Sequence, residues 1–154
     1  LILRTPGMKQ SGASTESIAE MIDFYRTLTE LAGLSPIPEY VQGTSLVPVL
    51  EDPSVIVRPD ALTQLPHGYT LRTKQFRYSR WKEGAPNNIE LYNRLKDPAE
   101  MVNLARDPGH AWVINQLDKR LNERIQEATS HPEGLSFTSP APDDKGVSKA
   151  DEYF

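Results

Sequence analysis

The stretch GYTLRTKQFRYSRW, residues 68–81, carries the strongest structural signal in this chain. Its apolar side chains occupy odd positions in the first half and even positions in the second, at Tyr69, Leu71, Phe76 and Tyr78. Because the side chains of a β-strand alternate between two faces, this change of phase requires a turn, which we place at 73–75. The stretch predicts a β-hairpin whose aromatic residues, Trp81 included, pack in a core, with Arg72 on the opposite face.

The segments that follow extend the hairpin into a small α+β unit. EGAPNN at 83–88 predicts a second turn, and IELYN at 89–93 predicts a third antiparallel strand. The Asp-Pro pairs at 97–98 and 107–108 each offer an N-cap and a first-turn proline. They predict a short helix through Leu104 and a longer helix after it. The apolar residues of the longer helix share one side, at Val113, Ile114, Leu117, Leu121 and Ile125.

The N-terminal part predicts a buried strand and an amphipathic helix. The apolar run LILR at 1–4 is closed by a turn, which is typical of a buried strand. Ser17 and Glu20 form a capping-box pattern, so we expect a helix from Ile18 onward. Its apolar residues recur at helical steps and predict a face packed in the core: Ile18, Met21, Ile22, Tyr25, Leu28, Leu31 and Ala32. Residues 34–66 are rich in proline and predict an irregular connection.

The composition argues against several classes of function. A net charge of −4 lacks the cationic surface that nucleic acids and anionic membranes require, so we expect neither as a partner. The chain has no cysteine, and its three histidines stand far apart, so we assign no metal ligand. No apolar run approaches the roughly 18 residues of a membrane span. The chain starts with Leu inside an apolar run, and we expect an N-terminal portion to lie outside it.

Three segments resemble the sulfatases of the alkaline-phosphatase superfamily. Residues 18–53 are similar to the sulfatase helix that ends in L-A-G and the G-x-S-L-x-P-L-L box that follows a proline-rich loop. Residues 90–108, ELYNRLKDPAEMVNLARDP, resemble the E-L-Y-D-L and D-P-x-E signature near sulfatase C-termini. The opening LILRTPGMK resembles a strand and P-G turn of these enzymes. The resemblance covers residues 1 to about 126. It includes the hairpin stretch at 68–81, which looks closest to iduronate-2-sulfatase-like and choline-sulfatase-like members.

The resemblance implies a division of the chain into three parts. Residues 1–50 would be the last strand and helix of the sulfatase α/β core. Residues 51–130 would be the C-terminal subdomain, a small four-stranded antiparallel sheet packed by a C-terminal helix. Residues 131–154 would be a tail.

The resemblance also implies the chemistry. Sulfatases hydrolyse organic sulfate esters with a formylglycine made within a C/S-x-P-S-R motif and a divalent cation, usually calcium, and neither motif nor cation ligands occur here. Sulfate-ester hydrolysis needs an activated nucleophile and a cation that stabilises developing charge. We therefore expect this chain to complete the fold and the cleft rim of a sulfuric ester hydrolase, with no catalytic residue of its own. Calcium, formylglycine and the N-terminal catalytic portion would be its partners, and a sulfated small molecule or glycan its substrate.

Arg72, His67 and Lys74 are the candidate substrate-binding residues. They belong to the most cationic stretch of the chain, and the bidentate guanidinium of arginine suits a carboxylate or a sulfate. The alternative is a solvated strand face with cross-strand pairs, in which His67 bonds only to local backbone. Arg77, Arg80 and Lys82 fit the solvated alternative better.

Two other functions remain open at this point. A phosphodiesterase or phosphonate hydrolase of the same superfamily would differ in the nucleophile, which lies outside these residues. A non-catalytic binding module would fold by itself, whereas an orphan subdomain would expose apolar surface at Leu1–Leu3 and on the helix after Ile18.

Overall fold

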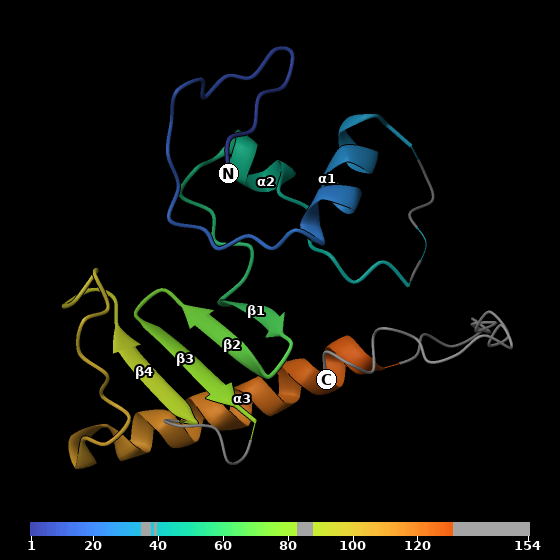
Figure 1. The fold of residues 1–154 in the computed structure, drawn as a ribbon. Helices are drawn as coiled ribbons and strands as arrows, with labels where there is room; N and C mark the ends of the chain where they lie inside the picture. The colour runs from blue at the N-terminus through green and yellow to red at the C-terminus, as the bar shows by residue number, and fades with distance from the viewer. Residues whose placement is uncertain (35–37, 39, 83–87, 131–154) are drawn as a thin grey trace, which may run out of the picture.

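The computed structural model describes residues 1–34, 38, 40–82 and 88–130. Figure 1 shows two layers, with the helices α1 and α2 and the N-terminal loop above, and a sheet with helix α3 below. The upper layer contains α1 (Asp23–Leu31) and α2 (Val47–Glu51). The lower layer contains β1 (Asp60–Leu65), β2 (Gly68–Thr73), β3 (Phe76–Trp81), β4 (Ile89–Asn93), the 3-10 turn η1 (Pro108–His110) and α3 (Ala111–Thr129).

The sheet is an antiparallel meander in the order β1-β2-β3-β4. The hairpin prediction is confirmed, because β2 and β3 pair with Leu71 opposite Tyr78 and Arg72 opposite Arg77. Strand β1 was missed by the residue pattern, although the family resemblance implies four strands. Its sequence, DALTQL, alternates weakly and places only Leu62 among the packed apolar residues.

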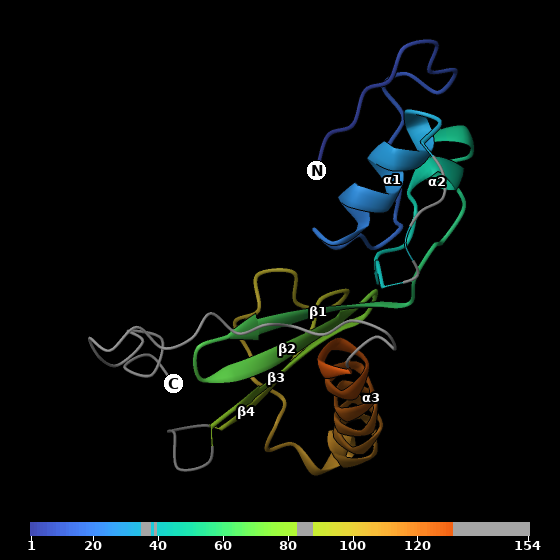
Figure 2. The same ribbon diagram turned by 90° about the vertical axis from the view of Figure 1, so that its right-hand side faces the viewer.

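The core lies between the sheet and α3, and Figure 2 shows α3 along one face of the sheet. Leu71, Tyr78, Leu91 and Leu121 are fully buried there. The predicted apolar side of α3 packs against them, which confirms the helix-on-sheet arrangement. Full burial of one such side chain stabilises the fold by about 2 kcal/mol. The opposite face, called here the second face, carries the alternate residues of the strands, among them Thr70, Arg72, Arg77, Ser79, Glu90 and Tyr92.

Two side chains of β3 were assigned to the wrong face. Trp81 lies on the second face instead of in the core, because it is an odd neighbour of the even-numbered core residues Phe76 and Tyr78. Arg80 is not simply solvated, since its Nη1 donates to Asp118 of α3 at 2.7 Å. Sequence reasoning failed here because Trp81 was placed by its apolar character instead of by its position in the strand.

The short helix predicted at 97–104 does not form. Its residues make turns, and Glu100 has a φ of 55°, which no right-handed helix tolerates. Asp97 accepts instead from the N–H of Val102 at 2.9 Å. At the second Asp-Pro pair, Asp107 accepts from Gly109 N at 2.9 Å and caps η1, as predicted.

Helix α1 begins later than its capping-box pattern predicts. The carboxylate of Glu20 does not cap the helix, because it accepts from Leu62 N at 2.6 Å in strand β1. Asp23, the first residue of α1, does not cap it either, since its Oδ2 accepts from Glu20 N, three residues earlier and outside the helix, at 2.7 Å. The hydroxyl of Ser17 accepts from Val57 N, so it is not a cap either.

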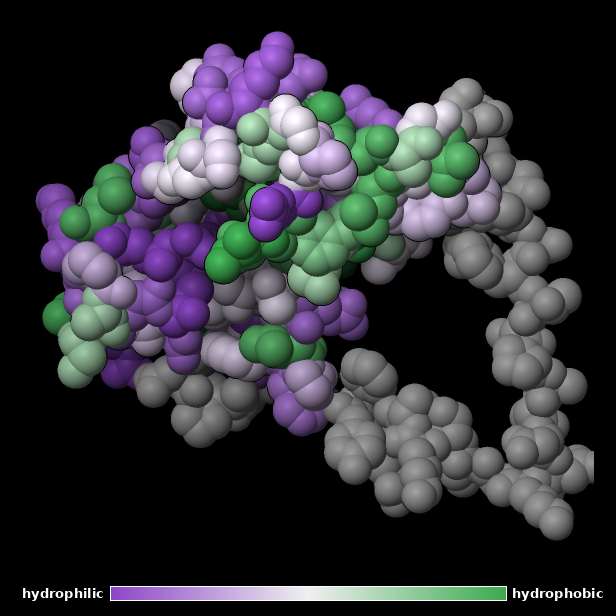
Figure 3. All heavy atoms as spheres, turned by 90° about the horizontal axis from the view of Figure 1, so that it is seen from above, coloured by the Kyte–Doolittle hydropathy of each residue, from purple (hydrophilic) through white to green (hydrophobic). Residues whose placement is uncertain are grey.

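The apolar stripe of α1 points outward. Asp23 and Thr27 of this helix are buried, with exposures of 0% and 1%, whereas Tyr25 is 56% and Leu28 is 62% exposed. Figure 3, seen from above, shows apolar residues gathered on this upper side of the molecule. The prediction that the stripe packs in a core is therefore wrong for the contacts within the described residues.

The N-terminal run also lacks the predicted strand. Residues 1–4 have no strand conformation, and Ile2 is 96% exposed. A strand requires a hydrogen-bonded neighbour, and the sheet formed by the described residues contains only β1 to β4. The tail at 131–154 and most of the turn at 83–88 lie outside the described residues. In the part of the chain that the structure describes, no helix is both long enough and apolar enough for a bilayer.

Candidate anion-binding site on the second face

A cluster of charged side chains fixes the sheet relative to α1. Arg58, which precedes β1, pairs with Glu20 and with Asp23. Arg124 of α3 donates to Glu20 at 2.9 Å, and Arg120 donates to Asp60 of β1 at 2.7 Å. We call these six residues the joint cluster: Glu20, Asp23, Arg58, Asp60, Arg120 and Arg124.

The charges of the joint cluster balance. Three carboxylates face three guanidiniums, and both Asp23 and Arg58 are buried. The hydrogen bond that Arg120 donates to Asp60 raises the pKa of Arg120. Burial lowers the pKa of Arg124, but Glu127, Glu20 and Asp60 together outweigh it and raise the pKa. Buried charges of this kind are tolerated only when every partner is present, so the cluster fixes one geometry between the two layers.

Three arginines gather at one end of the second face. Arg72 of β2 is the cross-strand partner of Arg77 of β3, and Arg94 follows β4 on the same side. The pKa of Arg94 is lowered, mainly by burial and further by the like charges of Arg72 and Arg77. The strand register, which puts Arg72 opposite Arg77 and Arg94 on the same side, accounts for this direction. Like charges directly opposite one another destabilise a sheet unless an anion lies between them.

Glu100 is the anion that the protein itself supplies. Its carboxylate pairs with Arg77 and lies 3.0 Å from Nε of Arg94. Arg77 also stacks over the ring of Tyr92, 5.6 Å from its centroid, which adds a cation–π contact. Arg72 is exposed and has no ion pair or hydrogen bond from its side chain among the described residues.

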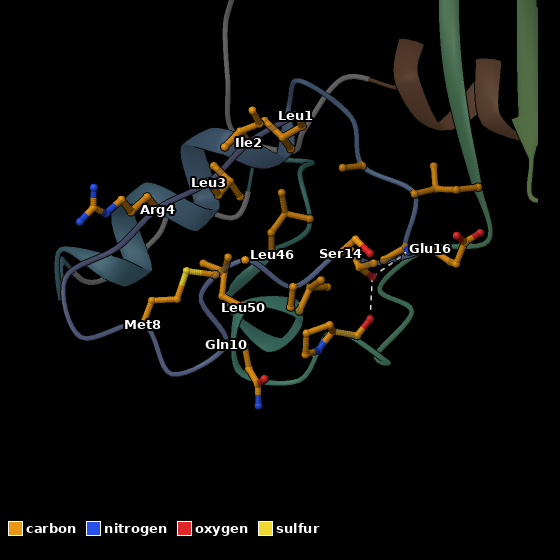
Figure 4. Close-up of a pocket in the computed structure, with 18 of the residues that line it drawn as sticks. Leu1, Ile2, Leu3, Arg4, Met8, Gln10, Ser14, Glu16, Leu46 and Leu50 are labelled. Atoms are coloured by element: carbon orange, nitrogen blue, oxygen red, sulfur yellow. Dashed lines mark hydrogen bonds between the residues drawn. The ribbon is translucent and has the colours of Figure 1, made fainter.

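Arg72 also borders a cavity of about 840 Å³. Ala61 of β1 lines the same side, and the apolar wall comes from Leu46, Val49 and Leu50. Figure 4 shows the N-terminal run crossing this cavity, with Leu3 above Leu46 and Leu50, while the guanidinium of Arg4 points away. Arg72 therefore lies between this cavity and the other two arginines, and no described residue neutralises its charge.

The structure separates the other two candidates from each other. Lys74 is exposed in the β2–β3 turn, two residues beyond Arg72. His67 lies before the other end of β2, roughly 16 Å of strand from Arg72, and lines a pocket of about 370 Å³ with Trp81 and Lys82. One site can thus include Arg72 and Lys74, whereas His67 belongs to a different part of the surface.

Sequence reasoning missed Arg77, Arg94 and Glu100 as members of this group. Arg77 was grouped with the solvated residues, yet its register opposite Arg72 follows directly from a two-residue turn at 74–75. Arg94 has the same parity as Tyr92, which would have placed it on the second face. Glu100 gave no signal, because the pattern around it predicted a helix.

The arrangement offers several cationic donors to an anion. Guanidiniums offer charge-assisted donors to sulfate or carboxylate. Among the described residues there is no group of three or more His, Cys, Asp or Glu side chains that could hold a metal ion.

The family model described as N-sulphoglucosamine sulphohydrolase, C-terminal, matches residues 1–127. Arylsulfatase K of Bos taurus is 28% identical over 81% of this chain and 25% of its own length. The chain thus spans about a quarter of the curated relatives it matches.

Solved structures share the fold as well. A 2-O GAG sulfatase aligns with a TM-score of 0.60 and 28% identity, over 74% of this chain and 26% of that one. The phosphonate monoester hydrolase of Agrobacterium radiobacter aligns with a TM-score of 0.51 and 27% identity, over 68% of this chain and 24% of that one. The four-stranded sheet with its C-terminal helix is therefore a recurrent unit in larger hydrolases of this type.

Proposed function

Because this chain belongs to the family of N-sulphoglucosamine sulphohydrolase C-terminal domains, we propose that it is the C-terminal part of a sulfatase that hydrolyses sulfate esters of glycans. The observation that carries the proposal is the family match over residues 1–127, which includes both layers of the fold. In this proposal the chain completes the fold and forms a wall of the substrate cleft, while the nucleophile lies in another part of the protein.

The proposed partner is an N-terminal catalytic portion. The outward stripe of α1 supports it, because Tyr25, Leu28 and Leu31 form a helical row of exposed apolar side chains. Ridges of this kind bury against a second element in a folded protein. Leu1 and Ile2 are exposed nearby and would gain a neighbouring strand from the same partner.

Calcium and formylglycine belong to this proposal only as groups of the N-terminal portion. The described residues do not fit either one, since they include no C/S-x-P-S-R motif and no cluster of metal-ligating side chains. When present, these groups would supply the nucleophile and the positive charge for sulfate-ester cleavage. The contribution of this chain is to bind and orient the rest of the substrate.

Within the substrate class we propose a 2-O-sulfated, iduronate-like unit of a glycosaminoglycan. The alignment with a 2-O GAG sulfatase supports this choice. Such a substrate carries anions besides the reacting sulfate, and Arg72 offers an uncompensated guanidinium beside the cavity. The bidentate geometry of arginine matches a uronate carboxylate.

A phosphonate hydrolase is the second candidate function, favoured by the alignment with the phosphonate monoester hydrolase. The test is to express the complete protein that contains this chain and to measure two products. Sulfate release from a 2-O-sulfated glycosaminoglycan disaccharide supports the first proposal. Faster hydrolysis of a phosphonate monoester supports the second, and binding of the disaccharide without any hydrolysis would favour a non-catalytic module.

A further inference from the structure

Glu100 has an unusual backbone. Its φ of 55° is the only left-handed value among the non-glycine residues that the structure describes. Glutamate is a poor choice for this conformation, which glycine and asparagine adopt at lower cost. A strained residue persists only where its surroundings determine it, and such residues concentrate at functional sites.

The contacts of Glu100 show what determines it. Its N–H donates to Asp97 O at 3.0 Å, which closes the turn that reverses the chain. The turn brings the carboxylate against Arg77 on β3 and Arg94 after β4, and the side chain is only 14% exposed. A carboxylate is thus carried from a loop onto the second face, where both of its oxygens engage guanidiniums.

Three guanidiniums and the carboxylate of Glu100 meet on this part of the second face. Arg72, Arg77 and Arg94 repel one another, and Glu100 binds the last two. Of these three arginines, Arg72 is the one whose side chain makes no ion pair or hydrogen bond with a described residue. The next carboxylate on the face, Glu90, stands opposite Ser79 and makes no ion pair with the described residues.

From this arrangement we propose that Glu100 is a positioning residue that sets substrate selectivity. It holds Arg77 and Arg94 to the protein, so that Arg72 alone grips one anionic group of the substrate. The inference rests on the proposed sulfatase function and narrows it. The site accepts glycans that bring one anion to this position and disfavours glycans that bring two.

The test uses two variants of Glu100 in the complete enzyme. Glu100→Gln keeps the shape of the side chain and removes its charge, while Glu100→Gly removes the carboxylate and relieves the backbone strain. The substrates are two 2-O-sulfated disaccharides that differ by one additional sulfate. We expect kcat/KM for the disaccharide with the additional sulfate, relative to the other, to rise about fivefold in both variants, because Arg77 and Arg94 become available.

Salt dependence gives a second readout. The slope of log kcat/KM against log salt concentration reports how many charges the substrate engages, so it should become steeper in both variants. Glu90→Gln is the matched control and should leave both the ratio and the slope unchanged.

The outcomes separate the two levels of the proposal. If the unaltered enzyme releases no sulfate, the proposed function fails. If it is active but both variants lose activity equally on the two substrates with an unchanged slope, Glu100 has only a structural role and the inference is wrong. Glu100→Gly also removes the carboxylate. If this variant retains the selectivity of the unaltered enzyme, the charge of Glu100 does not set selectivity, and the inference is wrong as well.

Discussion

Glu20 and Arg124 are 104 residues apart in the chain, yet their side chains lie 2.9 Å apart and join the segment before α1 to α3. The same carboxylate pairs with Arg58 and accepts from the N–H of Leu62. One side chain therefore links the segment before α1 to Arg58, to strand β1 and to the last third of α3.

Removal of this carboxylate's charge should destabilise the protein strongly. Glu20→Gln leaves the buried Arg58 and the half-buried Arg124 with one charged partner fewer each, which costs about 3 kcal/mol. Hydrogen exchange should also accelerate at the amide of Leu62, a local effect that mass spectrometry can follow. Glu16→Gln is the control, since Glu16 is exposed and makes no ion pair with the described residues, and it should change stability by less than about 0.5 kcal/mol. Equal stability of both variants would show that the joint cluster does not couple the layers.

Tyr78 should make stability sensitive to alkaline pH. Burial and the neighbouring Asp118 raise the pKa of its phenol above the ordinary value of 10.0. The neutral phenol is favoured in the fold, so its stabilisation is complete below pH 10 and declines above it, as the unfolded chain ionises first. Tyr78→Phe should cost about 1 kcal/mol at neutral pH through loss of the hydrogen bond to Asp118. Above pH 10 the variant should lose stability less steeply in urea unfolding, and parallel curves would contradict the prediction.

Gly43 should tolerate no side chain. A Cβ atom there would lie 2.1 Å from the carbonyl oxygen of Ile22, which is backbone and cannot move aside. Gly43→Ala should therefore separate the loop from the start of α1 and lower the free energy of unfolding by about 2 kcal/mol. Gly109→Ala meets only a side-chain oxygen at 3.3 Å and serves as the control. Comparable melting temperatures for the two variants would exclude close packing at Gly43.

Arg72 should matter for charged substrates only. Arg72→Ala removes the uncompensated guanidinium and should lower kcat/KM about tenfold for a uronate-containing sulfate ester. A neutral aryl sulfate should be hydrolysed at the original rate, because it brings no second anion. His67→Ala should leave both rates unchanged, since His67 lies at the other end of β2. Unchanged turnover of both esters by Arg72→Ala would remove this arginine from the site.

The outward stripe of α1 should behave differently in the chain and in the complete protein. Tyr25→Lys with Leu28→Lys should reduce dye binding and aggregation of the isolated chain, because two exposed apolar residues disappear. The same change should lower the folding yield of the complete protein, where a charge would be buried at the proposed contact. Met101→Lys alters an even more exposed apolar residue outside α1 and is the control. An unaffected complete protein would contradict the proposed partner surface.

Prediction from sequence was accurate where the repeat pattern of apolar residues was enough to determine the structure. The hairpin was predictable because alternation fixes the faces of Leu71 and Tyr78 once the turn is placed. The stripe of α1 was read as core because periodicity tells which face is apolar but not whether a partner belongs to the same chain. Strand β1 was missed because Asp60 occupies a core-facing position, and its charge is compensated by Arg120 of distant α3.

The candidate site was only partly predictable for a similar reason. Arg72 could be chosen because it stands on a predicted strand in a cationic stretch. Its relation to Arg94 depends on two strand pairings, and its relation to Glu100 depends on a left-handed backbone that no composition rule indicates. His67 is close to Arg72 in sequence, but an extended strand carries the two apart.

The joint cluster restricts how such a molecule can be recombined. A sheet transplanted from a relative would retain its own hydrophobic interior, yet it would reach α1 with whatever charges its inherited surface carries. If it lacked the equivalents of Arg58 and Arg124, Glu20 and Asp23 would be sealed in without counter-ions. Exchange of C-terminal units between such proteins should therefore succeed only when the acidic and the basic residues of the joint cluster are exchanged together.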